Sequence, residues 1–172
     1  ERIQAVLDTA PAITDGPGGA APEGNAVAFR NVSFAYPGAE APVLDGVSFT
    51  AAPGAVTAVI GATGSGKTTL LNLLPRFLEA TGGEISIGGC DVRALPLAEL
   101  RNLIAVVPQH SYLFSGTLAA NLRMAAPAAT DAELWQALDA AQAEEFVRTL
   151  PQGLESPVSQ GGTNFSGGQR QR

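Results

Sequence analysis

Two kinds of hydrophobic pattern predict strands along this chain. Residues 26–37 and 46–51 alternate apolar and polar side chains, which is typical of half-buried strands, and we expect these two to pair antiparallel. Residues 54–61 and 102–109 are continuous apolar runs, which predict strands buried on both faces, as in a parallel sheet. Residues 82–89 predict a short strand between glycine turns. Together these patterns favour an α/β fold.

Apolar residues at helical spacing occur between and after these strands. Residues 67–78 predict a helix with Pro75 in its last turns, and residues 95–101 predict a shorter helix. Residues 115–124 and 130–150 also have helical spacing. These helices complete the alternation of strands and helices that an α/β fold requires.

The last of these helices has a recognisable start and an apolar stripe. Thr130 precedes it, with Glu133 close behind, as in an N-terminal capping box. Trp135 shares the apolar stripe with Leu134 and Leu138. We therefore expect Trp135 to pack in the core and not to contact a ligand.

The N-terminal residues differ in composition from the rest. Ile3, Val6 and Leu7 are at helical spacing, which predicts the end of a helix. Residues 10–25 are rich in proline, glycine and alanine and hold almost no large apolar side chain, which is typical of a linker. The domain itself is expected over residues 26–172.

Composition narrows the class of protein. Of the 172 residues, 45% are hydrophobic and 15% are charged, as in a globular domain. The net charge of -6 argues against a nucleic-acid partner, which usually leaves a basic footprint. No apolar run reaches the roughly 18 to 20 residues of a membrane helix, so we expect the chain by itself to be soluble.

Three residue types that occur once in the chain add a little more. Cys90 cannot form an internal disulfide, which suits a reducing compartment, and we expect it in a turn after a strand. His110 is expected to be a solvated loop residue. The chain begins at Glu1 and its methionine is Met124, so we expect a segment of a longer polypeptide.

The stretch GATGSGKTT, residues 61–69, matches the phosphate-binding pattern G-x-x-x-x-G-K-[ST] between a predicted strand and a predicted helix. Its glycines let backbone N–H groups turn toward a polyphosphate, and the helix N-terminus adds partial positive charge. Lys67 is expected to reach the β- and γ-phosphates, and the Thr68 hydroxyl to ligate Mg²⁺. The predicted nucleotide contacts are Gly61, Thr63, Gly64, Ser65, Gly66, Lys67, Thr68 and Thr69. This phosphate loop indicates a nucleoside triphosphate and leaves the protein class open.

The C-terminal stretch NFSGGQRQR, residues 164–172, closely resembles the signature motif of ATP-binding cassette (ABC) proteins. Phe165 stands where leucine is commonest in that family, an apolar replacement. The signature resemblance is what separates this chain from other phosphate-loop proteins.

Three further segments are similar to landmarks of the same family. Tyr36 resembles the aromatic A-loop residue that stacks on adenine; the alternative is a core aromatic at a strand end. Gln109 resembles the Q-loop glutamine that reaches Mg²⁺ and the γ-phosphate. SPVSQGG, residues 156–162, resembles the X-loop of exporters, with Gln160 where glutamate is usual. The four landmarks occur in the family's order.

The resemblance implies a fold and a chemistry. The fold is a P-loop NTPase (RecA-like) core with an antiparallel β-subdomain and an α-helical subdomain. The ligands are ATP and Mg²⁺, with Thr68 and Gln109 on the metal and with Lys67 and Gln109 as catalytic groups. Two nucleotide-binding domains are expected to form a head-to-tail dimer. The signature of each then completes the partner's ATP site through Ser166, Gly167, Gly168 and Gln169.

Other parts of the family pattern are expected beyond Arg172. These are the Walker B strand with its aspartate and catalytic glutamate, the D-loop and the switch histidine. The C-terminal part of the fold and the base that activates water would then be missing from residues 1–172, and we expect these residues alone to show no sustained ATP hydrolysis. Because the missing strand lies beside the phosphate-loop strand, Val56, Val59 and Val106 are expected to lack part of their packing, which would make the chain marginally stable.

Two segments are similar to half-size exporters. ERIQAVLDTAP, residues 1–11, resembles the stretch that joins the last transmembrane helix to the nucleotide-binding domain, so residues 1–25 are expected to be that helix end and linker. LFSGTLAANL, residues 113–122, is similar to the segment that faces the coupling helices. The resemblance therefore implies an ATPase-driven exporter with a transmembrane domain in the same polypeptide, at the cytoplasmic face of the plasma or inner membrane.

Two alternatives stay open on the sequence. A soluble cassette ATPase of DNA repair or translation fits the motifs, although the acidic net charge counts against it. A non-cassette P-loop kinase would leave the signature unexplained. The transported substrate and the choice between homodimer and heterodimer have no counterpart in these residues.

Overall fold

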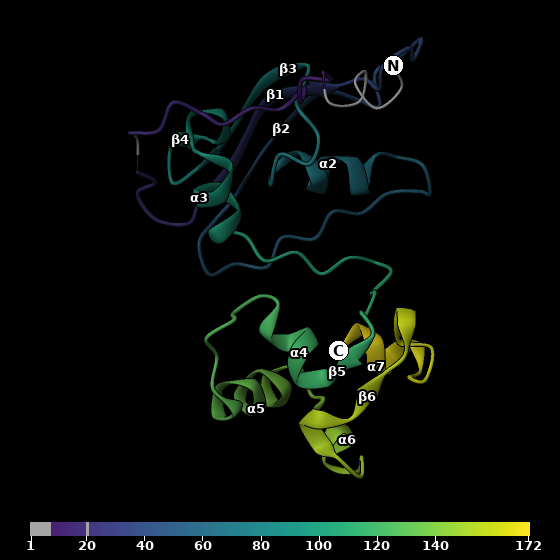
Figure 1. Cartoon of the computed structure of the whole chain (residues 1–172). Helices are drawn as coiled ribbons and strands as arrows, with labels where there is room; N and C mark the ends of the chain where they lie inside the picture. Colours follow the sequence, from purple (N-terminus) through teal and green to yellow (C-terminus); the bar gives the residue numbers. More distant parts are fainter. Residues whose placement is uncertain (1–7, 20) are drawn as a thin grey trace. The chain divides into compact units, whose positions relative to one another are not determined.

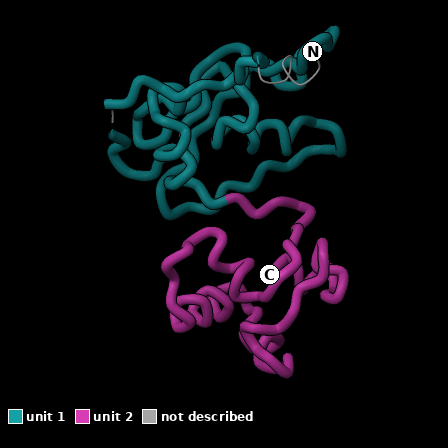
Figure 2. Tube along the Cα trace, in the orientation of Figure 1, with its two compact units in different colours: residues 1–105 teal, residues 106–172 magenta. Residues whose placement is uncertain are grey.

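The computed structural model describes residues 8–19 and 21–172 (Figure 1). The chain divides into two compact units, residues 1–105 (unit 1) and residues 106–172 (unit 2) (Figure 2). The helix end predicted at Ile3, Val6 and Leu7 lies outside the described residues. Within the described ranges, no helix combines the length and the apolar character needed to cross a membrane.

Unit 1 is built on a four-stranded sheet with the order β2-β1-β3-β4 (Figure 1). β1 (Val27–Phe34) pairs antiparallel with both β2 (Leu44–Ala51) and β3 (Gly82–Ile87). β4 (Cys90–Asp91) pairs antiparallel with β3. The predicted antiparallel pair and the predicted short strand are confirmed. These segments form strands because alternation places their apolar side chains on one common face.

A bulge at Asn31 determines which side chains of β1 face the core. Phe29, Val32 and Phe34 are all buried, although strict alternation would put Phe29 and Val32 on opposite faces. Asn31 has a φ of 51°, and the pairing of β1 with β2 shifts between Phe29 and Val32. The extra residue reverses the alternation, so that Val32 also faces the core.

Two short helices and the segment from β4 to α3, which includes a 3₁₀ turn (Val92–Ala94), supply the rest of this core. α2 (Lys67–Leu73) contributes Leu70 and Leu73, and α3 (Leu97–Asn102) contributes Leu100. α2 ends before Pro75, which has no N–H to continue the helical ladder. α2 is thereby anchored in the core of unit 1 through its buried leucines.

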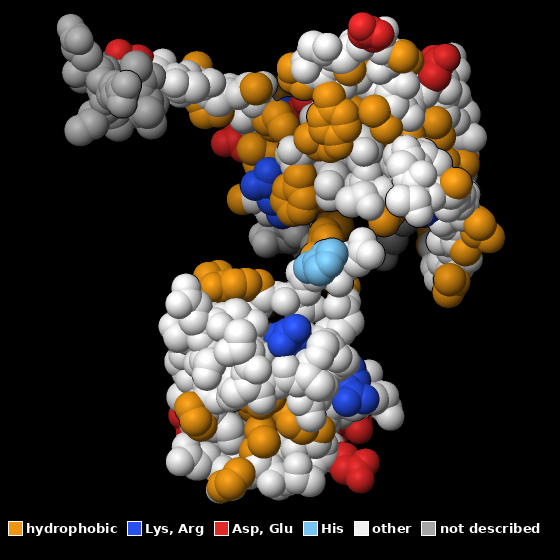
Figure 3. All heavy atoms as spheres, turned by 90° about the vertical axis from the view of Figure 1, so that its right-hand side faces the viewer, with side chains coloured by type: hydrophobic (Ala, Val, Ile, Leu, Met, Phe, Trp, Pro, Cys, Tyr) orange, Lys and Arg blue, Asp and Glu red, His pale blue; other side chains and the backbone are white. Residues whose placement is uncertain are grey.

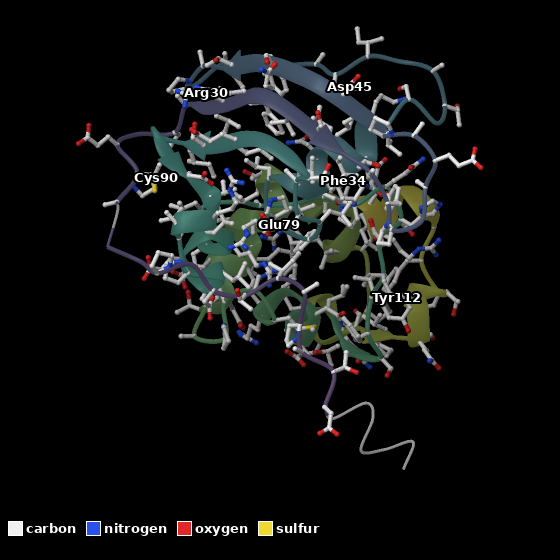
Figure 4. All side chains as sticks on the ribbon, turned by 90° about the horizontal axis from the view of Figure 1, so that it is seen from above. Arg30, Phe34, Asp45, Glu79, Cys90 and Tyr112 are labelled. Carbon is white, nitrogen blue, oxygen red and sulfur yellow. The ribbon has the colours of Figure 1, made fainter. Side chains whose placement is uncertain are left out.

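The β3–β4 hairpin corrects the prediction for Cys90. Gly88 and Gly89 form the two-residue turn, with φ values of 53° and 78°, which glycine adopts readily. Cys90 is not in the turn but is the first residue of β4 (Figure 4), where its side chain is buried. In the same hairpin, burial raises the pKa of Asp91, but hydrogen bonds from the side chain and backbone of Arg93 outweigh burial and hold it below its ordinary value.

The described part of the predicted linker is hydrogen-bonded to the β3–β4 hairpin and to the residues at the start of α3. The Gly16 and Glu23 N–H groups donate to the carbonyls of Leu95 and Gly88, at 3.3 and 2.9 Å. The carboxylate of Asp15 accepts the N–H of Leu97 at 2.8 Å and so caps the start of α3 from a distant part of the chain. A segment of linker composition therefore lies against the domain, which its composition did not indicate.

The two continuous apolar runs do not form the predicted buried strands. Residues 54–61 and 102–109 hold no strand in the described structure. Val56 is 99% exposed and Val107 is 75% exposed. No described strand supplies their N–H and C=O groups with a ladder, and a run of this composition needs neighbours on both edges and both faces. The reduced packing expected at Val56, Val59 and Val106 is confirmed, and hydrophobic side chains are prominent on the surface of unit 1 (Figure 3).

Unit 2 is a cluster of short helices with a small two-stranded ladder. β5 (Gly116–Thr117) pairs antiparallel with β6 (Pro157–Val158). The other elements of this unit surround a second hydrophobic core. They are α4 (Leu118–Arg123), α5 (Asp131–Ala140), α6 (Glu144–Arg148), two 3₁₀ turns (Gly153–Glu155 and Gln160–Gly162) and α7 (Gly167–Gln171). Unit 2 is the predicted helical subdomain.

The helix predicted over residues 130–150 is two helices. Its start is confirmed, since Thr130 and Glu133 form both hydrogen bonds of a capping box. α5 then ends because Gln142 has a φ of 56°, and Ala143 N–H donates to Leu138 C=O at 2.8 Å. This is a Schellman termination without glycine, so the sequence carried no sign of it. Trp135 is partly buried against the core, as predicted.

Candidate functional site

The phosphate loop, residues 61–69, requires glycine at two positions for reasons internal to unit 1. Gly66 has a φ of 86°, and a Cβ on it would lie 2.9 Å from Leu44 Cδ2. A Cβ on Gly61 would lie 2.5 Å from the Ser65 hydroxyl. Both distances are shorter than nonbonded contacts allow, so a side chain at either position would require its neighbours to shift, and at Gly66 the left-handed φ would add strain.

Lys67 closes this loop from the first turn of α2. Its ammonium donates to the carbonyls of Gly61 and Ala62, both at 2.7 Å, and lies 3.4 Å from the Ser65 hydroxyl. Three donors on a flexible stem can exchange such neutral acceptors for anionic oxygens, which form shorter and stronger hydrogen bonds. The Lys67 ammonium thus lies inside the turn of the loop, next to the carbonyls of Gly61 and Ala62.

The hydroxyl residues of the loop divide into exposed and buried ones. Thr63, Ser65 and Thr68 are exposed, as is Gly64, so their polar groups are accessible. Thr69 is buried and its hydroxyl lies 3.1 Å from the Tyr36 hydroxyl. The accessible set contains Thr68, the predicted metal ligand.

Tyr36 is brought next to the phosphate-loop helix. Besides its hydrogen bond to Thr69, its ring meets the ring of Phe34 edge to face, with centroids 4.8 Å apart. Tyr36 nevertheless remains 44% exposed, so part of the ring is available to a ligand. Phe34 occupies the core position at this strand end (Figure 4), which argues against the core alternative for Tyr36.

The second glycine-rich stretch begins α7 in unit 2. The Ser166 hydroxyl accepts the N–H of Gln169 at 3.2 Å, and the Gln169 side chain accepts the N–H of Ser166 at 2.8 Å. These reciprocal bonds form a capping box that defines the helix start. Gly167 and Gly168 are exposed, and a Cβ on either would meet nothing within 4 Å.

Phe165 and Arg170 anchor this stretch to its unit. Phe165 is buried and packs edge to face against Phe146, with ring centroids 5.7 Å apart. The Arg170 guanidinium donates to the carbonyls of Phe165 and Gly162, at 2.8 and 3.2 Å. The apolar replacement at Phe165 therefore fills a core position, and Arg170 joins the X-loop-like segment to α7.

Gln109 and His110 lie in an exposed loop of unit 2, as predicted for His110. The phosphate loop belongs to unit 1, so the approach of Gln109 to bound phosphate stays a prediction. Sequence reasoning missed the side chains that hold this loop, among them Gln171, which hydrogen-bonds to Pro108 and Ser111. The sequence offered one sign of this contact, a second glutamine, Gln171, near the end of the stretch NFSGGQRQR.

Comparison with known proteins adds an independent finding. A family model described as "ABC transporter" matches residues 44–172. An uncharacterized ABC transporter ATP-binding protein of Mycobacterium tuberculosis is 46% identical over all of this chain, which covers 30% of that protein. An ATP-dependent lipid A-core flippase of Xanthomonas campestris is 48% identical over 85% of this chain and 25% of its own length.

A solved structure gives the same answer for the fold. A bacterial Atm1-family ABC exporter with ATP bound is similar with a TM-score of 0.92 and 33% identity, over 98% of this chain and 30% of that one. The chain thus spans less than a third of the length of each of these relatives. The similarity extends over both units. It includes residues 54–61 and 102–109, where strands were predicted and the described structure holds none.

Proposed function

The chain belongs to the ABC transporter family, and from this premise we propose that it is the ATP-binding domain of an exporter. The observation that carries the proposal is the loop of residues 61–69, with Lys67 inside it and Tyr36 beside it. Membership in the family implies that the complete protein binds and hydrolyses ATP. The runner-up, a soluble cassette ATPase, has no relative among these proteins in its favour.

The residues present fit a nucleoside triphosphate. The loop is compact at Gly61 and Gly66: a larger residue at Gly66 would be strained by its left-handed φ, and one at Gly61 would require the Ser65 side chain to move. Lys67 and the backbone of the exposed residues 63–65 would hold the phosphates, with the Ser65 N–H exchanging its present bond to the Ala62 carbonyl for a phosphate oxygen. The exposed part of the Tyr36 ring would stack on the base. Bound ATP supplies the phosphoanhydride whose cleavage releases free energy for transport.

Thr68 and Gln109 would hold Mg²⁺ beside the phosphates. The Thr68 hydroxyl is exposed on the first turn of α2, next to Lys67, and hydroxyl and amide oxygens are ligands that Mg²⁺ accepts. Gln109 is exposed in its loop and can therefore approach a ligand. Neither group is charged, so most of the charge on the metal would be balanced by the phosphates.

The signature stretch would serve a second copy of the domain. Ser166 caps α7, and the N–H groups of Gly167 and Gly168 are exposed at the helix start. Since nothing within this unit requires glycine there, a close approach by another molecule is the remaining physical reason for it. This supports a head-to-tail dimer in which each signature completes the partner's ATP site.

The complete protein would be anchored in a membrane. The relatives include a flippase and an exporter, and each is much longer than this chain. We propose that a transmembrane domain of the same polypeptide joins residues 1–25, which would place the ATP site at the cytoplasmic face of the membrane. Transport across that membrane would then be driven by ATP hydrolysis in the dimer.

Titration with a fluorescent ATP analogue tests the nucleotide site. Lys67→Ala should abolish tight binding, because the phosphate cradle loses its mobile cation. Thr130→Ala is a matched control that disturbs a helix cap of unit 2 and leaves the residues of the phosphate loop unchanged, so it should bind as the wild type does. Wild-type affinity in the Lys67→Ala protein would remove Lys67 from the site and overturn the proposal.

A further inference from the structure

The loop that carries Gln109 is attached to α7 through one side chain, Gln171. The Gln171 amide donates from Nε2 to the carbonyl of Pro108 at 3.0 Å, and its Oε1 accepts the hydroxyl of Ser111 at 2.9 Å. The two contacted residues lie on either side of Gln109. All of these residues belong to unit 2, so the contact lies within a single compact unit.

A second amide holds the far end of the same loop. Asn121 of α4 accepts the N–H of Phe114 at 2.8 Å and donates to the carbonyl of Phe114 at 2.9 Å. Tyr112 (Figure 4) lies between the two attachments and meets Phe114 edge to face at 5.2 Å. The loop is therefore a segment fixed at both ends, and Gln171 determines the end nearer to Gln109.

The chemistry of the contact requires a neutral amide. A carbonyl oxygen accepts and a hydroxyl donates, so the bridging group needs one donor and one acceptor at the same time. Glutamate would keep the bond from Ser111 but would turn a carboxylate oxygen toward the carbonyl of Pro108, which is repulsive. Leucine has similar size and makes neither bond.

α7 connects this contact with the signature. Ser166 caps the first turn of the helix, and Gln171 is its last residue. Arg170, the neighbour of Gln171, holds the X-loop-like segment at Gly162. A displacement of the signature by an approaching partner would therefore move both loops together.

We propose that Gln171 is a positioning residue that couples the signature helix to the loop of Gln109. It acts through the backbone of Pro108 and the hydroxyl of Ser111 and does not itself touch nucleotide. This inference rests on the proposed function, since Gln109 matters only if the protein turns over ATP. The attachment itself is a property of the fold and can be measured without nucleotide.

The first measurement is hydrogen–deuterium exchange of residues 108–114 in the full-length protein without nucleotide. Gln171→Leu and Gln171→Glu should both speed exchange there, since each breaks at least one attachment. Gln136→Leu, at an exposed glutamine of α5, is the matched control and should leave this segment unchanged. Unchanged exchange in both Gln171 variants would overturn the attachment, whether or not the protein hydrolyses ATP.

The second measurement is steady-state ATP hydrolysis by the full-length protein. Gln171→Leu should lower kcat by about fivefold, the equivalent of one hydrogen bond, and leave KM for ATP unchanged. In a Gln109→Ala background the same substitution should cost little more, because the loop then has no glutamine to position. Equal losses in both backgrounds, or a loss in Gln136→Leu as large as in Gln171→Leu, would overturn the coupling. A wild-type protein that neither binds nor hydrolyses ATP would instead refute the proposed function.

Discussion

The phosphate loop (residues 61–69) and the signature stretch (residues 164–172) are both rich in glycine, but two glycines of the loop meet other surroundings than the two of the signature. The third glycine of the loop, Gly64, has open space around it, and its left-handed φ of 83° is what favours glycine there. In the phosphate loop, a side chain at Gly61 or Gly66 would collide with neighbouring atoms of unit 1. In the signature, a side chain at Gly167 or Gly168 would meet open space. The first pair is explained by the fold of its own unit, whereas the second pair is not. The difference points to a surface outside the unit, which is the basis for assigning the signature to a partner.

The largest expected effect tests that assignment with mixed dimers of full-length chains. When one chain carries Ser166→Arg and the other carries Lys67→Ala, both lesions fall on one composite site and the other site stays whole. When one chain carries both substitutions, each site loses one half. The first arrangement should therefore keep more ATPase activity than the second, because an arginine at the signature blocks only the partner's phosphate site.

The reverse order of activities would show that the signature serves the phosphate loop of its own chain. The monomeric Ser166→Arg protein should still bind ATP at its own loop, which a nucleotide titration checks. Ser166 is exposed, so the larger side chain fits the unit without displacing its core.

The second prediction compares the glycines directly. Gly66→Ala should destabilise unit 1 by at least about 1–2 kcal/mol, because Gly66 has a left-handed φ and alanine there is strained. Gly168→Ala should leave stability unchanged or slightly raised, because alanine favours helix over glycine. It should lower ATPase activity of the full-length dimer on the order of tenfold, the value of one hydrogen bond to a charged group.

Thermal unfolding and steady-state hydrolysis of the two variants separate these outcomes. A Gly168→Ala protein that unfolds more easily than the wild type would place the requirement for glycine inside unit 2. That result would contradict the claim that the fold of unit 2 does not require glycine at position 168.

The same two regions show what could be predicted from the sequence. The antiparallel pair β1 and β2, the short strand β3 and the capping box at Thr130 follow from patterns of neighbouring residues, and all three are confirmed. The pairing of β3 with β1 was not predicted. Residues 54–61 were wrongly predicted as a strand, because a doubly buried strand depends on neighbours that a local pattern does not specify. The bulge at Asn31 and the helix end at Gln142 were missed because neither residue is glycine or proline.

The candidate site divides in the same way. The motif of the phosphate loop determines its own geometry, and Tyr36 was predicted to belong to it from family resemblance. Gln171 was not predicted, because its partners Pro108 and Ser111 lie about sixty residues away and hydrogen bonds at that separation leave no periodic pattern. A single polar contact between a helix and a distant loop, such as that of Gln171, cannot be predicted from the sequence pattern.

The third prediction concerns the base-binding side of the phosphate loop. Tyr36→Ala should weaken nucleotide binding by about 1–3 kcal/mol, the value of one stacked base. Tyr36→Phe should bind almost as tightly, although it loses the hydrogen bond to Thr69 and with it about 1 kcal/mol of folding stability. Isothermal titration and thermal unfolding measure the two effects separately. Equal loss of affinity in both variants would mean that the hydroxyl, and not the ring, contacts the ligand.

The smallest expected effect lies at the start of α5 in unit 2, outside both glycine-rich stretches of the sequence. Hydrogen bonds from the backbone and then the side chain of Thr130 lower the pKa of Glu133 from its ordinary 4.5. A carboxyl with a lowered pKa in the folded state stabilises the fold fully above its unfolded pKa, and this stability is lost as pH falls through the folded value. The wild-type chain should therefore lose the contribution of this cap below pH 4.5. Glu133→Gln keeps an acceptor for the Thr130 N–H without a titrating group, so its thermal midpoint should change less between neutral and acidic pH. An NMR titration of the Glu133 carboxyl with a midpoint at or above 4.5 would contradict the capping contribution.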